Sequence, residues 1–359
     1  MRVLHLIESL EFGGAEKVAI DLANAMAERH EVTICCVKQV GDLGGTVDSR
    51  IRVLCLNKRE GNDYFVPFRL AQILRKFKID VLHAHNWGVY LEASLASLLA
   101  RTQVAIHTVH GPYLDYLPGW RPRLKRTIRH TLERLFSPRF AKIVTVSDSI
   151  QEYIRDEIGI APTRLLTVHN GIKTQGIQIA KKESRETRCI TVGRLAEVKN
   201  QAMMIRAFHA ADCETATLYL VGDGPERTKL VSLLRELGIE DRVVITGFRQ
   251  DVSELLAQSD IFLMSSNYEG ISIAVLEAMR AGLPVIGTNV GGMAETVKPE
   301  TGFLVAAGDI SAMADAIRSL LRSPMIRSSL GTAGRKFLEA EFSIDQMVAR
   351  YELLYGGKR

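Results

Sequence analysis

The feature that most constrains the fold is an alternation of short apolar runs with amphipathic segments, which occurs twice along the chain. In the first half, strand-like runs fill 3–8, 31–37, 81–85, 103–110 and 142–147, and helical spacing of apolar residues fills the intervals, beginning at 13–29. Strands separated by helices run parallel and bury both faces of their sheet. This rhythm predicts a parallel α/β domain.

The rhythm stops after residue 171 and then restarts. The segment IKTQGIQIAKKESRETR (172–188) is polar and lysine-rich, and we interpret it as an interdomain linker. Further strand-like runs follow at 189–194, 216–224, 243–248, 261–266, 284–289 and 302–305. We expect two doubly wound, Rossmann-like domains, 1–170 and 171–342, that face a central cleft, and a C-terminal helix in 343–359 that packs back toward the first domain.

Composition excludes several other classes. The 47% hydrophobic and 24% charged content is that of ordinary globular proteins. Five cysteines without CxxC spacing disfavour a zinc site or a disulfide framework and fit a reducing compartment. The run MRVLHLIESL is interrupted by His5 and Glu8, which favours a buried strand over a signal peptide, and no window is apolar enough to span a bilayer. We expect a cytoplasmic protein.

The excess positive charge lies in the first half of the chain. Residues 1–172 hold 23 Lys/Arg and 18 Asp/Glu, whereas 173–359 hold 23 of each, so the first half carries the whole net charge of +5. Such an excess arises by chance or indicates an anionic partner.

The segment 118–140 combines basic residues with apolar residues at three- and four-residue spacing. The apolar positions are Trp120, Leu124, Ile128, Leu132, Leu135 and Phe136. This pattern is typical of a basic amphipathic helix that binds an anionic membrane surface through 121–139, or of a helix packed on a sheet with a solvated basic face. Nucleic acid is not expected as a partner, because no recognition module accompanies the charges.

In the second half, VGRLAEVKNQ (192–201) places Arg194 at the end of a strand and Lys199 just before a helix. Two cations at the carboxyl end of a strand suit a diphosphate, and a solvated basic loop is the alternative. The strand–turn–helix VGDGPER (221–227) is expected to shape the site without touching the ligand.

The stretch EGISIAVLE sets Glu269 before a helix and Glu277 within it, in an apolar surrounding. The backbone N–H groups of Gly270, Ile271 and Ser272 would face a phosphate above the helix start. Carboxylates accept hydrogen bonds from paired hydroxyls. The spacing therefore suggests Glu269 on a sugar, the amides on a phosphate and Glu277 on a ribose. Two surface glutamates on an amphipathic helix are the alternative.

In the first half, Gly13 and Gly14 follow the first strand and precede a helix, either as a plain turn or as a close approach to a ligand. His110 ends a strand before Gly111 and Pro112, where it can donate to hydroxyls, act as acid or base, or be structural. His83 and His85 are weaker candidates of the same kind.

Together these motifs resemble the retaining glycosyltransferases of family four, which have the GT-B fold. The resemblance covers nearly the whole chain and rests on the motifs GGAE, VHGP, GRL followed by Lys199, VGDGPE and EGISIAVLEAMRAGLPVIG. The last of these is similar to the family's E-x7-E motif. It implies that Gly14 approaches the donor phosphate or sugar, and that Phe248 and Arg249 border the nucleobase. It also implies that Arg194 and Lys199 bind the diphosphate. His110 would contact the donor sugar near its reacting carbon. Lys173, in HNGIK, departs from the aspartate common in the family.

The resemblance implies a metal-independent retaining hexosyltransferase that takes a nucleotide-diphosphate sugar, with UDP favoured, and needs no cofactor. The basic segment suggests a glycan or lipid-linked acceptor for cell-surface polysaccharide such as lipopolysaccharide, with peripheral contact at the inner face of the cytoplasmic membrane. The sequence contains no Asp-x-Asp to hold a metal. A hydrolase using two carboxylates, a UDP-sugar epimerase and a non-catalytic binding protein remain alternatives. A hydrolase does not explain Arg194, Lys199 and the glycines, the match of EGISIAVLEA disfavours the epimerase, and a non-catalytic protein would be expected to lack the charged residues that are present here.

Overall fold

The computed structural model describes the chain except for residues 60, 62, 112–119, 176–185, 213 and 358–359, and it describes no side chains at 120–122. The chain divides into two compact units, described separately below. Unit 1 comprises Met1–Gly171 and Ile344–Arg359, and unit 2 comprises Ile172–Ser343. Most of the expected linker lies outside the described residues.

Unit 1 is built on a seven-stranded, all-parallel sheet in the order β3-β2-β1-β4-β5-β6-β7. Its strands are β1 (Arg2–Ser9), β2 (Glu31–Gln39), β3 (Arg52–Cys55), β4 (Val81–His85), β5 (Val104–Val109), β6 (Lys142–Thr145) and β7 (Leu165–Thr167). The central strands are apolar and buried, as expected for a sheet with both faces covered.

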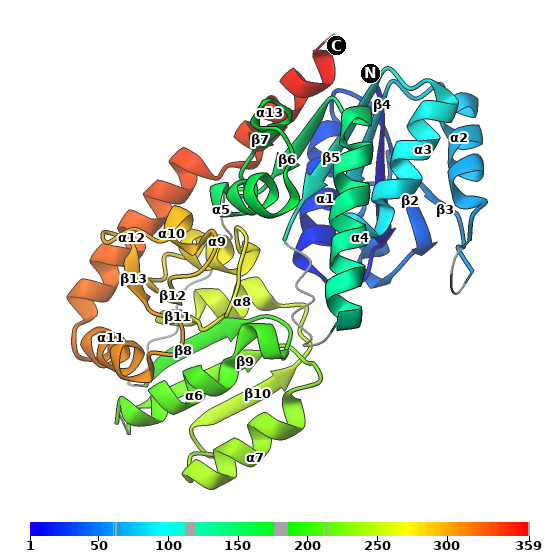
Figure 1. The fold of residues 1–359 in the computed structure, drawn as a ribbon. Helices are drawn as coiled ribbons and strands as arrows, with labels where there is room; N and C mark the ends of the chain where they lie inside the picture. The colour runs from blue at the N-terminus through cyan, green and yellow to red at the C-terminus, as the bar shows by residue number, and fades with distance from the viewer. Residues whose placement is uncertain (60, 62, 112–119, 176–185, 213, 358–359) are drawn as a thin grey trace. The chain divides into compact units, whose positions relative to one another are not determined.

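The helices of unit 1 cover both faces of this sheet (Figure 1). They are α1 (Gly14–Met26), α2 (Val66–Lys76), α3 (Tyr90–Ala100), α4 (Trp120–Phe136), α5 (Asp148–Tyr153) and α13 (Ile344–Gly356). Helix α2 contacts α3 and α3 contacts α4, whereas α13 contacts α1. The C-terminal helix therefore belongs to the core of unit 1, and it buries Met347 and Tyr351 at helical spacing.

Unit 2 repeats this architecture with a six-stranded, all-parallel sheet in the order β10-β9-β8-β11-β12-β13. Its strands are β8 (Thr187–Val192), β9 (Ala216–Val221), β10 (Val243–Gly247), β11 (Ile261–Met264), β12 (Val285–Thr288) and β13 (Gly302–Val305). Its helices are α6 (Gln201–Ala210), α7 (Arg227–Leu237), α8 (Val252–Ala257), α9 (Ile273–Arg280), α10 (Met293–Thr296), α11 (Ile310–Arg322) and α12 (Pro324–Glu341).

Local sequence explains where several of these helices begin. The side chains of Asn200, Asp309 and Ser323 each accept a hydrogen bond from a backbone N–H in the first turn of α6, α11 and α12, respectively. Pro324 occupies the first helical position of α12, where no backbone N–H is needed. These caps fix helix starts that the sequence pattern alone placed only approximately.

Both sheets share one topological property that locates a binding site. In each, the chain order reverses beside the first strand, between β1 and β4 in unit 1 and between β8 and β11 in unit 2. In open α/β sheets, ligands bind outside the carboxyl ends of the strands at such a switch point. The loops that follow β8 and β11, and those that follow β1, β4 and β5, are therefore the places to look for chemistry.

Three boundary predictions were wrong by a few residues. β8 ends at Val192, because Gly193 adopts a φ of 157°, so Arg194 lies in the loop and not in the strand. β5 ends at Val109, since the backbone N–H of His110 donates to Asn86 Oδ1 and not to a strand partner. Helix α9 begins at Ile273, three residues after Gly270, because Ser272 is extended. Within the described residues, no helix is long and apolar enough to cross a bilayer.

Candidate functional site

Lys199 and Glu269 form an ion pair in unit 2, on the loops that follow β8 and β11. Lys199 Nζ lies 2.5 Å from Glu269 Oε1, and Ser266 Oγ donates to the same oxygen at 2.6 Å. The Glu269 side chain is only 9% exposed, whereas that of Lys199 is 25% exposed. A carboxylate this buried needs charged or hydrogen-bonding partners to offset its lost hydration. The structure thus brings together two residues that the sequence nominated separately.

The loop that carries Glu269 is fixed by contacts on every side. Ser265 Oγ donates to the carbonyl oxygens of Lys199 and Asn200, at 3.0 Å and 2.9 Å. Thr288 Oγ1 donates to the Ser266 carbonyl at 2.6 Å. Gly291 has a φ of +50°, and a Cβ there would lie 1.9 Å from the Glu269 carbonyl oxygen. The backbone of Glu269 is therefore held from β12 as well as from β8.

Arg194 lies in the loop between β8 and Lys199. Its carbonyl accepts from Gln201 Nε2 at 3.0 Å, which ties the loop to α6. Its side chain is exposed and has no ion-pair partner among the described residues. The loop passes close to the end of β9, where a Cβ on Gly222 would lie 2.1 Å from the Gly193 carbonyl oxygen. The Gly-Asp-Gly turn thus shapes the loop of Arg194, as expected.

Helix α9 starts beside the ion pair and carries Glu277. Ser272 occupies the N-cap position without a side-chain capping hydrogen bond. Ile271 and Ser272 are buried, Gly270 is half-buried, and Glu277 is half-buried within the helix. An α-helix N-terminus without a side-chain cap has backbone donors suited to an anion.

Phe248 and Arg249 follow β10. Phe248 is 49% exposed, so part of its ring is accessible to a ligand. Arg249 makes a two-point ion pair with Asp251, at 2.8 Å and 2.6 Å. Its guanidinium is therefore already matched to a carboxylate, which leaves Phe248 as the stronger candidate for contact with a base.

In unit 1, Gly13 is the N-cap of α1 and Gly14 its first residue. A Cβ on Gly13 would lie 2.0 Å from the carboxylate of Glu16, whereas one on Gly14 would meet nothing within 4 Å. Burial raises the pKa of Glu16, and the nearby Glu8 and Glu11 raise it further. This negative surrounding suits sugar hydroxyls better than phosphate at Gly14.

His110 follows β5 at the carboxyl edge of the unit 1 sheet. Its backbone is anchored by Asn86, which follows β4 and adopts a φ of 62°, unusual for a residue other than glycine. Its side chain is part of a cluster of five histidines: His5, His83, His85, His107 and His110. Burial lowers the pKa of His110 to about 4 and those of His5 and His107 to about 3, so these imidazoles are neutral near pH 7.

His5, His83 and His85 offer nitrogen atoms that lie within 4.8 Å of one another, a spacing compatible with a metal ion. Their other contacts argue against one. Both ring nitrogens of His83 have hydroxyl partners, Tyr355 at 2.6 Å and Thr108 at 2.7 Å. No carboxylate belongs to this group of three, so nothing in it would offset the charge of a buried divalent cation.

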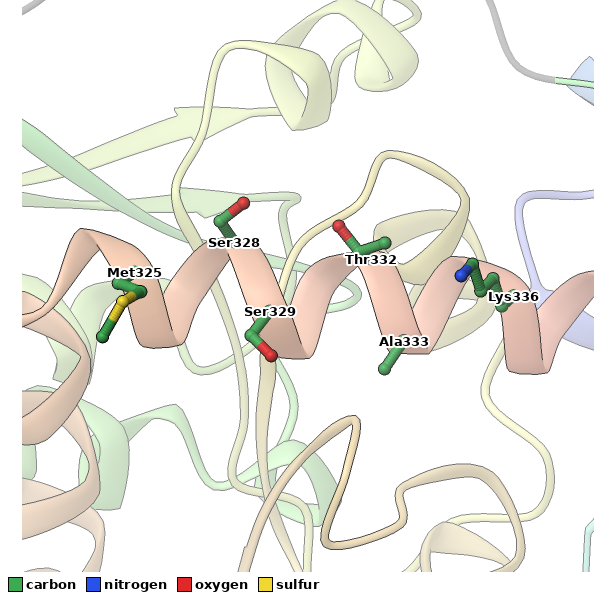
Figure 2. Close-up of a pocket in the computed structure, with 6 residues that line it drawn as sticks. All are labelled: Met325, Ser328, Ser329, Thr332, Ala333 and Lys336. Atoms are coloured by element: carbon green, nitrogen blue, oxygen red, sulfur yellow. The ribbon is translucent and has the colours of Figure 1, made fainter.

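A shallow hollow lies along α12 in unit 2 and is lined by Met325, Ser328, Ser329, Thr332, Ala333 and Lys336. Figure 2 shows these six side chains along the helix. None of them belongs to a motif that the sequence nominated, and the hollow contains no carboxylate. We assign it no catalytic part.

Sequence reasoning missed the residues that support the site. Ser265, Ser266 and Thr288 were visible only as small polar residues after apolar strands, which is a weak indication of a buried hydrogen-bond network. Asn86 and His5 were missed as well. The recurrence of histidine in three strands that the rhythm predicted to be parallel could have pointed to a shared cluster.

Known protein families match both halves of the chain. Residues 173–337 match the family described as "Glycosyl transferases group 1", and residues 12–175 match the one described as "Glycosyltransferase Family 4". The boundary between the two matches lies close to the boundary between the two units, near residue 172.

Individual proteins show the same relationship. The chain is 30% identical to the N-acetyl-alpha-D-glucosaminyl L-malate synthase of Bacillus anthracis over 311 residues, which cover 82% of this chain and 78% of that protein. It is 24% identical over 340 residues to UDP-Gal:alpha-D-GlcNAc-diphosphoundecaprenol alpha-1,3-galactosyltransferase of Escherichia coli, covering 88% of this chain and 87% of that one. The crystal structure of Anabaena HepE in complex with UDP-glucose superimposes with a TM-score of 0.83 at 21% identity, covering 99% of each chain. The two parallel sheets are thus those of the GT-B fold, and the chain belongs to glycosyltransferase family 4.

Proposed function

We propose that this glycosyltransferase moves a hexosyl group, with retention of configuration, from a UDP-sugar to a glycan or lipid-linked acceptor in cell-surface polysaccharide synthesis. The observation that carries this proposal is the pairing of Lys199 with the buried Glu269 beside the exposed Arg194. Arg194 and Lys199 supply positive charge at the switch point of unit 2, and Glu269 supplies a carboxylate that can accept hydrogen bonds from hydroxyls. A nucleotide sugar needs the first for its diphosphate and the second for its sugar.

The proposed chemistry follows from where charge develops. As the bond between the anomeric carbon and the diphosphate breaks, negative charge grows on the leaving phosphate. Arg194, Lys199 and the backbone N–H groups near Ser272 would stabilise that charge, which is the dominant contribution in many enzymes. With two cations in this role, we propose that no metal is required. The acceptor hydroxyl would attack the face that the phosphate leaves, with the phosphate taking its proton.

The remaining residues receive roles along one donor molecule. Glu269 would accept hydrogen bonds from the donor sugar, and Glu277 would accept them from the ribose. Phe248 would cover the base, with Arg249 at its border. Support comes from the exposure of Phe248 and from the half-buried position of Glu277 on α9.

Unit 1 would supply the acceptor side and two contacts to the donor sugar. His110 would donate to a sugar oxygen near the reacting carbon, and Gly14 would let the sugar approach the backbone. The open space over Gly14 and the acidic residues around it favour hydroxyls there. Gly13, with Glu16 folded over it, would shape the turn.

Two relatives support different acceptor classes. The name of the Escherichia coli relative specifies a diphosphoundecaprenol-linked sugar as acceptor, and that of the Bacillus anthracis relative specifies malate in its product. We favour the lipid-linked acceptor because α4 has both charge and apolar surface. A small hydroxy acid is the second candidate, favoured by the 30% identity to the malate enzyme.

Helix α4 is the proposed contact with the membrane. Leu124 and Ile128 are 51% and 52% exposed, whereas Arg129 on the same helix is buried. Two of the apolar positions in the amphipathic pattern are therefore partly turned to solvent, between Arg123, Lys125 and Arg126. Exposed leucine and isoleucine among basic side chains fit the headgroup region of an anionic bilayer.

The proposal is tested by incubating the protein with UDP-glucose, UDP-galactose and UDP-N-acetylglucosamine, each with a polyprenyl-diphosphate sugar or with malate, in the presence of EDTA. An α-linked product on one acceptor supports the proposal and names the acceptor class. Free sugar as the sole product would instead indicate a hydrolase, and activity that EDTA abolishes would contradict metal independence.

A further inference from the structure

Three imidazoles in unit 1 form a hydrogen-bonded chain that ends at His110. His110 Nε2 lies 3.0 Å from His85 Nδ1, and His85 Nε2 lies 3.1 Å from His5 Nδ1. The atoms at the two ends, His110 Nδ1 and His5 Nε2, are buried and have no hydrogen-bond partner among the described residues. The row of three imidazoles therefore has no hydrogen-bond partner at either end within the described part of the protein.

Strand register explains why only these histidines join. His5 on β1 lies opposite His83 on β4, and His83 and His85 share a face because side chains alternate along a strand. His107 on β5 lies opposite Ala84, so it projects from the other face, where it contacts Tyr90. His107 is thus buried close by but outside the chain.

His83 shares the face of the chain but has different partners. Its two nitrogens are matched by the hydroxyls of Tyr355 and Thr108, and Thr108 in turn contacts the Tyr351 hydroxyl at 2.9 Å. His83 therefore links α13 to the sheet through hydrogen bonds, whereas His85 and His5 belong to the hydrogen-bonded row that ends at His110.

Counting protons limits the states of the chain. Burial lowers the pKa of all three imidazoles, so each carries one N–H near pH 7. Because each imidazole has one N–H, each of the two hydrogen bonds uses one proton, and both bonds must run in the same direction along the row. The third proton lies at one end, either on His110 Nδ1 or on His5 Nε2.

The surroundings of the two ends decide between these states. An N–H buried without an acceptor is rarer in proteins than an acceptor without a donor. His5 Nε2 lies in the core of the sheet, where the described residues offer it no acceptor. His110 follows β5 at the carboxyl edge and is half-buried as a residue, although its Nδ1 atom is covered, so a bound ligand could supply an acceptor at this end but not at the fully buried His5. The favourable state therefore leaves a lone pair at His5 Nε2 and an N–H at His110 Nδ1.

We infer that His85 and His5 are positioning residues that hold His110 in its Nδ1–H tautomer, so that His110 is a hydrogen-bond donor to the bound sugar and not a base. This deepens the proposed function and rests on it for the identity of the ligand. His85 donates from Nδ1 to His110 Nε2, which removes the lone pair that a general base would need there.

The inference is tested on the full chain labelled with 15N-histidine, by recording the nitrogen shifts and two-bond proton couplings of each ring. The His110 resonance is assigned by its loss in His110→Gln. We expect Nδ1–H with an unprotonated Nε2 for His110. A His110 protonated at Nε2, or at both nitrogens at pH 7, would overturn the inference, and so would one bound equivalent of metal by elemental analysis.

A matched pair of variants separates tautomer control from simple packing. His85→Asn retains an amide that can donate near the position of Nδ1, whereas His85→Leu has nearly the same shape and no donor. We expect His110 to keep its tautomer in the first and to become a mixture in the second. His107→Leu, which removes a buried imidazole from the other face, should leave His110 unchanged. An unchanged His110 in a folded His85→Leu would contradict the inference.

Activity supplies a second readout once a donor is known. Loss of one oriented hydrogen bond predicts a kcat/KM lower by about three- to tenfold in His85→Leu, with partial recovery in His85→Asn. The tautomer measurement needs no donor and does not depend on whether His85→Leu folds, since the wild type alone can refute it. If nucleotide sugars fail to bind while His110 shows the Nδ1–H form, the proposed function fails and the tautomer assignment stands.

Discussion

Lys199 and Glu269, which are 70 residues apart in sequence, meet in an ion pair at the switch point of unit 2. The buried carboxylate has the ammonium and the Ser266 hydroxyl as partners before any donor is present. A diphosphate would draw Lys199 toward itself, and donor sugar hydroxyls would replace it on Glu269. The pair therefore holds the two side chains in place at the site that we propose for the donor.

Removal of Lys199 should lower stability, because it leaves the buried Glu269 carboxylate without its cationic partner. We expect Lys199→Met to reduce the free energy of unfolding by about 1–3 kcal/mol, because the buried Glu269 loses its charged partner. The double variant Lys199→Met/Glu269→Gln should recover most of this loss but not nucleotide binding. Urea denaturation followed by circular dichroism measures the first effect and calorimetry with UDP the second.

A control for this cycle is Lys229→Met, which removes a lysine that is 76% exposed and paired with Glu226. Such surface pairs contribute little, so its free energy of unfolding should change by less than about 1 kcal/mol. Equal losses in Lys199→Met and Lys229→Met would show that the Lys199–Glu269 pair has no special energetic weight.

Gly291 should be intolerant of any side chain. In Gly291→Ala the new Cβ would collide with the Glu269 carbonyl, in addition to the strain of a positive φ. Gly308→Ala is the matched control, since Gly308 has a φ of +84° and open space around it. We expect the control to lose about 1 kcal/mol and Gly291→Ala to lose more, together with donor binding. Thermal denaturation that ranks the two variants equally would argue against the close packing of the Glu269 loop.

Unit 1 should lose stability as the pH falls below about 6.5. His5 and His107 have pKa values lowered to about 3 and His110 to about 4, from an unperturbed 6.5. The unfolded state therefore binds more protons below pH 6.5, and the stability that is complete above this pH declines down to about pH 3. Each such histidine contributes a slope of about 1.4 kcal/mol per pH unit.

The measurement uses tryptophan fluorescence in urea at several pH values, since Trp87 and Trp120, the only two tryptophans of the chain, both belong to unit 1. His107→Phe should reduce the slope of the unfolding free energy against pH by the contribution of one histidine. A slope identical to that of wild type would mean that His107 is not buried in its neutral form.

The apolar surface of α4 should determine membrane binding along with its charge. We expect Leu124→Gln/Ile128→Gln to weaken sedimentation with anionic vesicles, because two exposed apolar side chains can no longer enter the interface. Leu353→Gln on α13 alters a leucine that is still more accessible, 78% exposed, and should leave binding unchanged. If the wild-type protein does not sediment with anionic vesicles at low salt, the proposed membrane contact of α4 is wrong.

The sequence predicted the architecture well and the supporting contacts poorly. Apolar runs and glycine turns located the strands of both sheets, with the exception of β3 and β7, two short edge strands that are partly exposed and lack a clear pattern. The pairing of Lys199 with Glu269 was not predicted, because it depends on which strand lies beside β8. Pattern reasoning also could not foresee that Leu124 and Ile128 face solvent while Arg129 is buried, since helical spacing does not say which face is covered.

The histidines show the same limit. Each lay in or beside a predicted strand, but the order of strands and their register decide that His5 and His85 reach His110 while His107 does not. A lone sequence specifies the alternation of side chains along a strand, and only the fold specifies which strands are neighbours.

The most direct test of the central claim is calorimetric titration of nucleotide diphosphates and nucleotide sugars, with EDTA present, into wild type, Glu277→Gln and Glu300→Gln. Glu300 is an exposed acid of unit 2 outside every motif, so its variant controls for the loss of one charge. We predict that wild type and Glu300→Gln bind one nucleotide class, UDP above the others, and that Glu277→Gln binds it at least about tenfold more weakly, as expected for the loss of a charged hydrogen bond. No binding by wild type, or equal binding by all three proteins, would contradict the assignment of Glu277 and the donor site.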